Sequence, residues 1–266
     1  MHRWDAERYQ SSPSDTQKWG RELVSKLNLK GGERVLDIGC GDGRVTAEIA
    51  HLVPRGAAVG IDSSPEMIAV AQRTFLPQQF ANLRFQQMDA TRLEFSDEFD
   101  VVFSNASLHW IADHRQVLQG IHRSLRYPGR LLLQMGGRGN AAEILATVST
   151  VAQARQWREY FQRPSSPVRF FEPEEYEALL SEAGLKAKRL ELVPKDMLHQ
   201  GKEGLASWIR AVWLPYTQRI PEAMREGFVA AVVDSYADRH PADDAGLIHI
   251  KMVRLEVEAE KEKQRG

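Results

Sequence analysis

The sequence predicts an α/β protein built around a doubly wound, mostly parallel sheet of seven strands. Between residues 33 and 134, short apolar runs alternate with segments whose apolar residues recur every three or four positions. A turn with three glycines joins the first apolar run to the first helical segment. Such alternation favours right-handed βαβ units, which form parallel sheets covered by helices on both faces. A chain of 266 residues can bury one large core, or one core with an added cap.

Five short apolar runs are expected to form the parallel strands. They are "ERVLDI" (33–38), "AAVGID" (57–62), "LRFQQM" (83–88), "FDVVFSN" (99–105) and "RLLLQM" (130–135). The helices expected between them are "RVTAEIAHLV" (44–53), "PEMIAVAQRTF" (65–75) and "DHRQVLQGIHRSL" (113–125). Pro65 suits a first helical turn, with Ser63 or Ser64 before it as the N-cap.

The flanking segments add helices and two further strands. The amphipathic stretch "SDTQKWGRELVSKL" (14–27) is typical of a helix, because Ser14 and Gln17 have the spacing of a capping box. After the fifth strand we expect, in order, a helical stretch to residue 160, a loop over 162–171, a helix over 173–184, a strand over 185–193, helices over 203–217 and 221–239, and a last strand over 247–261.

The composition argues against several classes of protein. A net charge of -1 lacks the basic excess of a nucleic-acid binder. No apolar run approaches the roughly 20 residues needed to cross a bilayer, and "MHRWDAERYQ" lacks the apolar core of a secretory signal. The single cysteine, Cys40, excludes an internal disulfide and a cysteine-rich metal site. We therefore expect a cytoplasmic protein with no metal requirement.

The glycine-rich turn narrows the choice of ligand. It reads "GCGDGR" (39–44), so its glycines fall as G-x-G-x-G. A dinucleotide fingerprint is G-x-G-x-x-G, and its third glycine position would here hold Arg44. A P-loop ends in Lys followed by Ser or Thr, which this turn lacks. The turn therefore suits neither a nicotinamide dinucleotide nor a nucleotide phosphate well.

Polar residues stand at the ends of successive strands. Asp37 ends the first strand, and Asp62 ends the second, where a carboxylate can accept both ribose hydroxyls of an adenosine. Asp89 follows the third strand and is placed to take an adenine amino group, while Ala90 packs beside the ring. Asn105 ends the fourth strand at the switch point of the sheet. An acid at position 62 also suits NAD, so Asp62 alone does not identify the cofactor.

Taken in order, "VLDIGCGDG", "GIDSSPEMI", "QMDA" and "FDVVFSNASLHW" resemble the class I S-adenosylmethionine-dependent methyltransferases, which have a Rossmann-like fold. The resemblance implies S-adenosyl-L-methionine as the cofactor, with its methionine end at the glycine loop and the Asn105 backbone near its sulfonium. It departs from the class at "LRYPGR" (125–130), where we expect a local backbone change and no loss of binding. The residues expected to bind the cofactor are Tyr9, Gln17, Asp37, Gly39, Cys40, Gly41, Asp62, Ser63, Met67, Asp89, Ala90, Asn105 and Trp110.

The flanks of these motifs resemble the trans-aconitate methyltransferase family and relatives that methylate small carboxylic acids. The similar stretches are "SNASLHWIADH", "MGGRGNAAEI" and the N-terminal "WDAERYQSS". The resemblance implies a small-molecule acceptor and O-methylation of a carboxylic acid; C- or N-methylation of another metabolite is the alternative. A carboxylate is already ionised at pH 7, so it needs orienting donors and no general base. A cofactor-binding protein without catalysis and an RNA methyltransferase are the candidates from other classes, and the balanced charge disfavours RNA.

His109 and Arg138 are the candidate catalytic residues. His109 could orient the acceptor, act as a base or make a structural hydrogen bond. Arg138 could pair with a carboxylate or be a solvated loop residue. Trp110 could lie near the adenine or the sulfonium, and Trp4, Tyr9 and Gln17 could close the pocket; simple packing is the alternative for each. The helix residues Trp208, Arg210, Trp213 and Tyr216 favour a packed face over a pocket lining.

These expectations describe a single domain, residues 1–266. Within it we expect a helical segment over 1–32, a cofactor-binding core over 33–193, a helical lid over 194–245 and a last strand with its tail over 246–266. The lid would lie over the carboxyl ends of the parallel strands, where ligands bind in such sheets. The expected partner is a small molecule, with no nucleic acid and no membrane, and the expected state is a monomer or a weak homo-oligomer.

Overall fold

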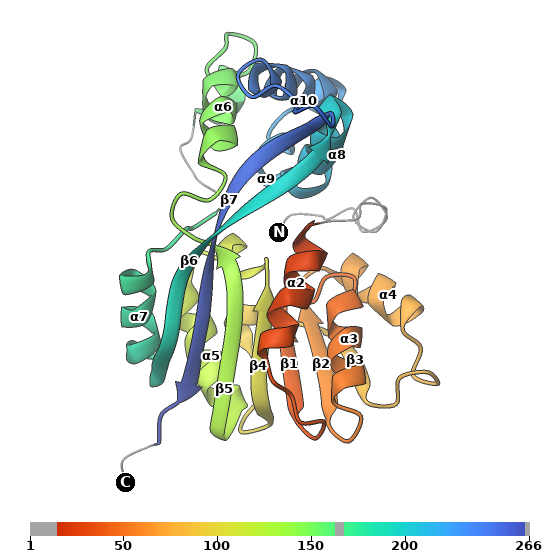
Figure 1. Ribbon diagram of the computed structural model, residues 1–266, viewed down its shortest axis with the longest axis vertical. Helices are drawn as coiled ribbons and strands as arrows, with labels where there is room; N and C mark the ends of the chain where they lie inside the picture. The colour runs from red at the N-terminus through yellow and green to blue at the C-terminus, as the bar shows by residue number, and fades with distance from the viewer. Residues whose placement is uncertain (1–14, 163–167, 264–266) are drawn as a thin grey trace. The chain divides into compact units, whose positions relative to one another are not determined.

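The structure, a computed structural model, describes residues 15–162 and 168–263. Its strands form one seven-stranded sheet in the order β3-β2-β1-β4-β5-β7-β6 (Figure 1). Strands β1 to β5 pair in parallel, and β7 runs antiparallel to β5. The expected α/β class with a mostly parallel, Rossmann-like sheet is confirmed. The strands are β1 (Arg34–Ile38), β2 (Ala57–Asp62), β3 (Leu83–Gln87), β4 (Phe99–Asn105), β5 (Leu125–Gly136), β6 (Leu185–Gln200) and β7 (Leu247–Lys261).

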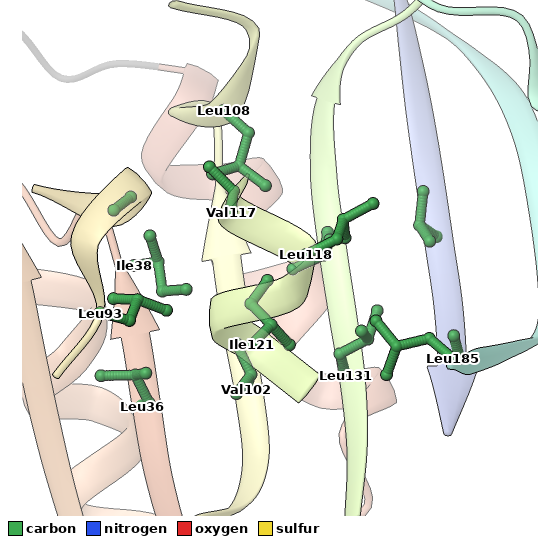
Figure 2. Packing of buried hydrophobic residues seen from close by; sticks show 14 of the residues in the cluster. Leu36, Ile38, Leu93, Val102, Leu108, Val117, Leu118, Ile121, Leu131 and Leu185 are labelled. Carbon is green, nitrogen blue, oxygen red and sulfur yellow. The ribbon is translucent and has the colours of Figure 1, made fainter. Parts of the chain in front are cut away.

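Helices cover both faces of the parallel strands. On one face α5 packs Val117, Leu118 and Ile121 against Leu36 and Leu131 of the sheet (Figure 2). On the other face, α2 and α3 bury their apolar residues against β1, β2 and β4. Burial of these apolar side chains is the main source of stability of such a core. The helices of this part are α2 (Asp15–Lys26), α3 (Arg44–Leu52), α4 (Pro65–Thr74), α5 (His114–Ser124) and α7 (Pro173–Glu182).

The chain divides into two compact units. Among the described residues, the core unit comprises 15–138, 168–193 and 254–263, and the second unit comprises 139–162 and 194–253. The second unit thus takes in residues 139–162 as well as the segment 194–245 that was expected as a lid. Its described helices are α6 (Ala142–Ala152), η3 (Arg158–Phe161), α8 (Gly201–Val212), α9 (Leu214–Thr217) and α10 (Glu222–Ala237). In this unit Phe228 lies against the rings of Trp157 and Phe161.

Several boundaries differ from the expectation. Strand β6 continues to Gln200, so residues 194–200 are a strand and not part of a helical insertion. Met197 and His199 are buried while their neighbours are exposed, which is the alternation of a strand, and Pro194 is tolerated because β6 is an edge strand. The helical stretch expected to residue 160 is interrupted, because α6 ends at Ala152 and η3 begins at Arg158. Ser14, the expected cap of α2, lies outside the described residues.

The "LRYPGR" segment shows the local backbone change that its sequence predicts. Strand β5 starts earlier than expected, at Leu125, which pairs with Phe99 of β4. The next pair is Val101 with Arg130, so five steps along β5 match two along β4. The register shift lies at the amino end of β5, and regular pairing continues from there to Asn105 and Gln134. It therefore leaves the carboxyl ends of these strands aligned.

Candidate functional site

The three glycines of the loop between β1 and α3 all have positive φ, but their surroundings differ. A Cβ on Gly39 would lie 1.9 Å from Ser107 Oγ, and one on Gly43 would lie 2.5 Å from the Phe85 ring. A Cβ on Gly41 would meet no heavy atom of the described residues within 4 Å. Packing explains Gly39 and Gly43, whereas Gly41 has an open side where a ligand can approach the backbone.

Hydrogen bonds fix the glycine loop to the end of β2. The backbone N–H groups of Gly39 and Cys40 both donate to the carbonyl oxygen of Ile61, at 2.8 and 2.9 Å. The N–H of Gly41 donates to Asp62 Oδ2 at 3.1 Å. The Cys40 side chain is buried, and burial raises the pKa of its thiol well above the ordinary value. Cys40 thus contributes its backbone to the loop surface, and its thiol stays protonated.

Asp62 is held between the glycine loop and the start of α4. Its Oδ1 accepts a hydrogen bond from Ser64 N at 2.8 Å, while its Oδ2 accepts the bond from Gly41. Burial raises the pKa of Asp62, and these N–H donors oppose the rise. Ser64, and not Ser63, is the N-cap, since its hydroxyl accepts from Met67 N at 3.2 Å. The cap fixes the buried Met67 side chain one helical turn beyond the carboxylate.

Asp37 lies at the end of β1, where it is almost completely buried. Thr46 Oγ1, on α3, donates a 2.6 Å hydrogen bond to Asp37 Oδ2. Burial, reinforced by the nearby negative charge of Asp62 and opposed by the Thr46 bond, raises the pKa of Asp37 to about 7. The folded protein therefore holds a proton on Asp37 until the pH approaches 7.

Asp89 and Ala90 lie where the third strand leaves the sheet. Asp89 caps the short helix η1 (Ala90–Arg92), and its Oδ1 accepts from Thr91 N at 2.9 Å and from Thr91 Oγ1 at 2.8 Å. Both bonds use Oδ1, which leaves Oδ2 for another donor. Asp89 is exposed and Ala90 is buried, so an acceptor and an apolar surface stand side by side.

The start of α2 is tied to both the glycine loop and the end of β4. Asn105 Nδ2 donates to the carbonyl oxygen of Thr16 at 2.9 Å, while its Oδ1 is buried without a hydrogen-bond partner among the described residues. Gln17 Oε1 accepts from Arg44 Nη1 at 3.3 Å, and Arg44 also pairs with Asp42 of the loop. The predicted residues Gln17 and Asn105 are thus brought to the same edge of the sheet as the loop.

His109 lies in the short helix η2 (Leu108–Trp110), just after β4. The backbone N–H of Gly136 donates to His109 Nδ1 at 3.4 Å, so the neutral ring carries its proton on Nε2. Burial, with the positive charge of Arg254 as a second cause, lowers the pKa of His109 well below its ordinary value. The Trp110 ring lies beside it, with centroids 5.1 Å apart. His109 is therefore a neutral N–H donor at pH 7.

Arg138 follows β5 and points to the start of α7. Its Nε lies 3.1 Å from Glu172 Oε1, and its Nη2 lies 3.6 Å from Glu175 Oε2. More than half of the side chain is exposed. To hold an acceptor carboxylate, Arg138 would have to exchange these two glutamates for it.

The aromatic residues predicted on one helix face pack on one another within the second unit. The Trp208 and Trp213 rings are 5.3 Å apart, as are those of Trp213 and Tyr216, and Trp213 is buried. Arg210, between them in the sequence, pairs with two glutamates. This is the packed face that the spacing favours. Trp4 and Tyr9 lie outside the described residues.

Three buried or loop-contacting residues of the core unit were missed by the sequence analysis. Thr46 holds Asp37, and Ser107 packs against Gly39. Arg254 of β7 is 2% exposed, and its guanidinium lies over the Trp19 ring. No local pattern distinguishes these residues: Ser107 and Arg254 act through partners that are distant in the sequence, and Thr46 lies nine positions after Asp37. No group of three or more metal-ligating side chains is found among the described residues, and none of the described helices is both long and apolar enough to span a membrane.

Comparison with known proteins identifies the family to which the chain belongs. The family model "Methyltransferase domain" matches residues 29–184, more than half of the chain. The chain belongs to this methyltransferase family, and it is an S-adenosylmethionine-dependent methyltransferase with the class I fold.

Individual proteins of known name or known structure are also similar to this chain. The chain is 33% identical over 199 residues to the "Uncharacterized methyltransferase C70.08c" of Schizosaccharomyces pombe, covering 73% of this chain and 75% of that one. It is 31% identical over 228 residues to the trans-aconitate 2-methyltransferase of Deinococcus radiodurans, covering 83% and 84%. The solved structure of YcgJ from Bacillus subtilis matches with a TM-score of 0.63 at 21% identity, covering 93% and 99%, and so shows the same fold. The resemblance to the trans-aconitate methyltransferases is confirmed.

Proposed function

We propose that this enzyme transfers a methyl group from S-adenosyl-L-methionine to a carboxylate oxygen of a small carboxylic acid. The observation that carries the proposal is the state of His109. Its Nδ1 already accepts from Gly136, its proton lies on Nε2, and its lowered pKa keeps the ring neutral. Such a ring can orient an acceptor by donating a hydrogen bond, but it is a poor base. A carboxylate acceptor needs none, because it is already ionised at pH 7.

The residues at the glycine loop fit the cofactor. Gly41 has room for the methionine part beside its backbone. Asp62 Oδ1 accepts from Ser64 N–H and Oδ2 from Gly41 N–H, and since each carboxylate oxygen can accept two hydrogen bonds, the carboxylate keeps acceptor capacity for the ribose hydroxyls. Asp89 Oδ2 is the acceptor for the adenine amino group, with Ala90 and Met67 as apolar neighbours of the ring. When bound, the cofactor supplies a methyl group activated on a positively charged sulfur.

The remaining task of the protein is to position the acceptor. Transfer from a sulfonium is an in-line displacement, so holding the attacking oxygen about 3 Å from the methyl group supplies much of the rate. We assign His109 Nε2–H to the acceptor carboxylate, and Arg138 to the same task if it leaves its two glutamates. Support for a small acid as the acceptor comes from the named activity of the Deinococcus radiodurans relative.

A radiolabelled methyl-transfer screen over small acids, amines and phenols tests the proposal. We expect label in one or more carboxylic acids and complete release of that label in mild base, because carboxyl methyl esters are hydrolysed there. Label that survives mild base would show transfer to carbon, nitrogen or a phenol and would overturn the assignment of a carboxylate acceptor. Calorimetry with S-adenosylhomocysteine checks the cofactor separately: a protein that binds NAD in preference would contradict the proposal at its first step.

A further inference from the structure

Residues 169–172, just before α7, contact both candidate catalytic residues. The backbone N–H of Arg169 donates to the carbonyl oxygen of His109 at 3.0 Å. The carbonyl oxygen of Phe171 accepts from the backbone N–H of Arg138, also at 3.0 Å. Phe171 also forms a parallel bridge to the residue that follows β5. This segment therefore joins the turn after β4 to the end of β5, and all of these residues belong to the core unit.

The side chains of the same segment also reach the two candidates. The Phe170 ring lies beside the His109 ring, with centroids 6.2 Å apart and planes tilted by 37°, which is within the range of aromatic pairs. Glu172 Oε1 lies 3.1 Å from Arg138 Nε. His109 and Arg138 are therefore each held by this segment twice, once at the backbone and once at the side chain.

Phe171 anchors the segment in the interior of the core unit. Its side chain is 1% exposed, and its ring centroid lies 4.6 Å from that of His114 on α5 and 5.3 Å from that of Tyr176 on α7. The Cζ of Arg169 lies 4.3 Å from the Phe171 centroid. His114 Nδ1 and the Tyr176 hydroxyl are 3.2 Å apart and share a hydrogen bond, which joins the two rings that hold Phe171. A ring packed in this way cannot move without losing several contacts.

Both ring partners of Phe171 are uncharged at neutral pH. Burial lowers the pKa of His114 to about 4. Burial also raises the pKa of the Tyr176 hydroxyl. The packing around Phe171 is therefore the same throughout the neutral pH range.

We propose that Phe171 is a positioning residue for methyl transfer. By fixing residues 169–172, it sets the position of His109 relative to Arg138, and so the position of the acceptor relative to the methyl group. The attacking atom must lie about 3 Å from the methyl carbon, and a displacement of about 1 Å in the groups that orient it can cost on the order of 100-fold in rate. The inference rests on the proposed function, which takes His109 and Arg138 as the groups that orient the acceptor.

The test compares Phe171→Leu with the control Phe99→Leu. Both phenylalanines are buried in the same hydrophobic cluster, but Phe99 begins β4 and so lies at the end of that strand away from His109. Both variants should therefore lower the melting temperature. With trans-aconitate as the probe, and at a temperature where both variants are folded, Phe171→Leu should lower kcat/KM about 10-fold, mainly through kcat. Phe99→Leu should stay within about twofold of wild type, because it is distant from the site. The affinity for S-adenosylhomocysteine should stay near wild type in both.

A double-mutant cycle measures whether Phe171 acts through His109. If Phe171 places the histidine, adding Phe171→Leu to His109→Asn should lower kcat/KM by only about threefold more, because the two changes affect one interaction. Independent effects would instead multiply, and the full 10-fold loss would recur in the His109→Asn background. That result would overturn the inference.

The NMR signals of the His109 ring nitrogens give a readout that needs no acceptor. In protein labelled with ¹⁵N-histidine, they should shift in Phe171→Leu and stay in place in Phe99→Leu. Unchanged His109 signals, or an unchanged kcat/KM, in folded Phe171→Leu would overturn the inference and leave the proposed function standing. If Phe171→Leu does not fold, Tyr176→Phe takes its place, since it removes only the hydroxyl bonded to His114, and kcat/KM should then fall about threefold. A wild-type enzyme that methylates no carboxylic acid would overturn the proposed function itself.

Discussion

The backbone N–H of Gly41 donates a hydrogen bond to Asp62 Oδ2 across 3.1 Å, which joins the loop after β1 to the end of β2. Because Asp62 also accepts from Ser64, one carboxylate sets the positions of the two segments that we assign to the cofactor. Asp62→Ala should therefore weaken S-adenosylhomocysteine binding by at least about 30-fold, through loss of the proposed ribose acceptor and of loop order. Isothermal calorimetry measures this. Asp97→Ala, at an exposed acid paired with Lys261, is the control, and its affinity should match wild type. Equal affinity in Asp62→Ala would contradict the assigned role.

Gly41→Ala and Gly39→Ala separate ligand approach from packing. Gly41→Ala adds a Cβ to the open side of the loop, so we expect a cost of about 1 kcal/mol in the free energy of unfolding, from positive φ alone. The loss of binding free energy for S-adenosylhomocysteine should be larger than this cost in stability, because the added Cβ occupies the side from which we expect the ligand to approach. Gly39→Ala should reduce stability strongly, because its Cβ overlaps Ser107, and Ser107→Gly should restore part of the loss. Urea unfolding and calorimetry report the two quantities. Full affinity in Gly41→Ala would show that nothing binds at the open side.

Much of this site follows from the sequence because its parts are local. Asp37, Asp62, Asp89 and Asn105 each end a short apolar run, and parallel strands bring those ends to one edge of the sheet. The glycine loop is likewise a short, continuous segment with a recognisable spacing.

The parts that sequence analysis missed depend on pairing between distant segments. Arg254 reads as one charged residue in an alternating strand, and its burial is set by Trp19, 235 positions earlier. Glu256, two residues on, is buried because Lys26 and Arg189 neutralise it from α2 and β6. Such partners belong to no shared motif, so periodicity assigns these positions to the solvent. The extension of β6 was missed for a related reason, since Pro194 and the polar residues around it obscure the alternation.

The raised pKa of Asp37 predicts a pH dependence of stability. Its pKa is 3.8 ordinarily and about 7 in the folded protein. Between these values the folded chain holds a proton that the unfolded chain has lost, so the contribution of Asp37 to stability is complete below pH 4 and is lost as the pH rises through 7. Asparagine cannot ionise, so the Asp37→Asn variant does not undergo this loss. From pH 5 to pH 8, its free energy of unfolding should therefore rise relative to that of wild type by roughly 2 to 3 kcal/mol.

Urea unfolding of ligand-free protein at the two pH values measures this gain. Asp97→Asn is the matched control, because the Lys261 amine lowers the pKa of that exposed acid. The contribution of Asp97 to the free energy of unfolding is lost only below pH 4, so the difference between Asp97→Asn and wild type should be the same at pH 5 and pH 8. Parallel pH curves for wild type and Asp37→Asn would show that Asp37 is ionised in the folded protein throughout this range.

His109→Asn tests whether the histidine orients the acceptor or takes a proton from it. Asparagine can keep an acceptor for Gly136 N–H near the place of Nδ1, but it lacks the Nε2–H donor. We expect kcat/KM for the acid to fall about 10-fold. Because the His109 pKa lies well below 6.5, its ring does not titrate between pH 6.5 and 8.5, and the shape of the profile over that range should be the same in both proteins. The measurement is kcat/KM against pH with saturating cofactor. If the wild-type pH profile of kcat/KM has an ionisation near pH 7 that is absent in His109→Asn, the histidine acts as a general base. The neutral state of His109 would then no longer support a carboxylate acceptor.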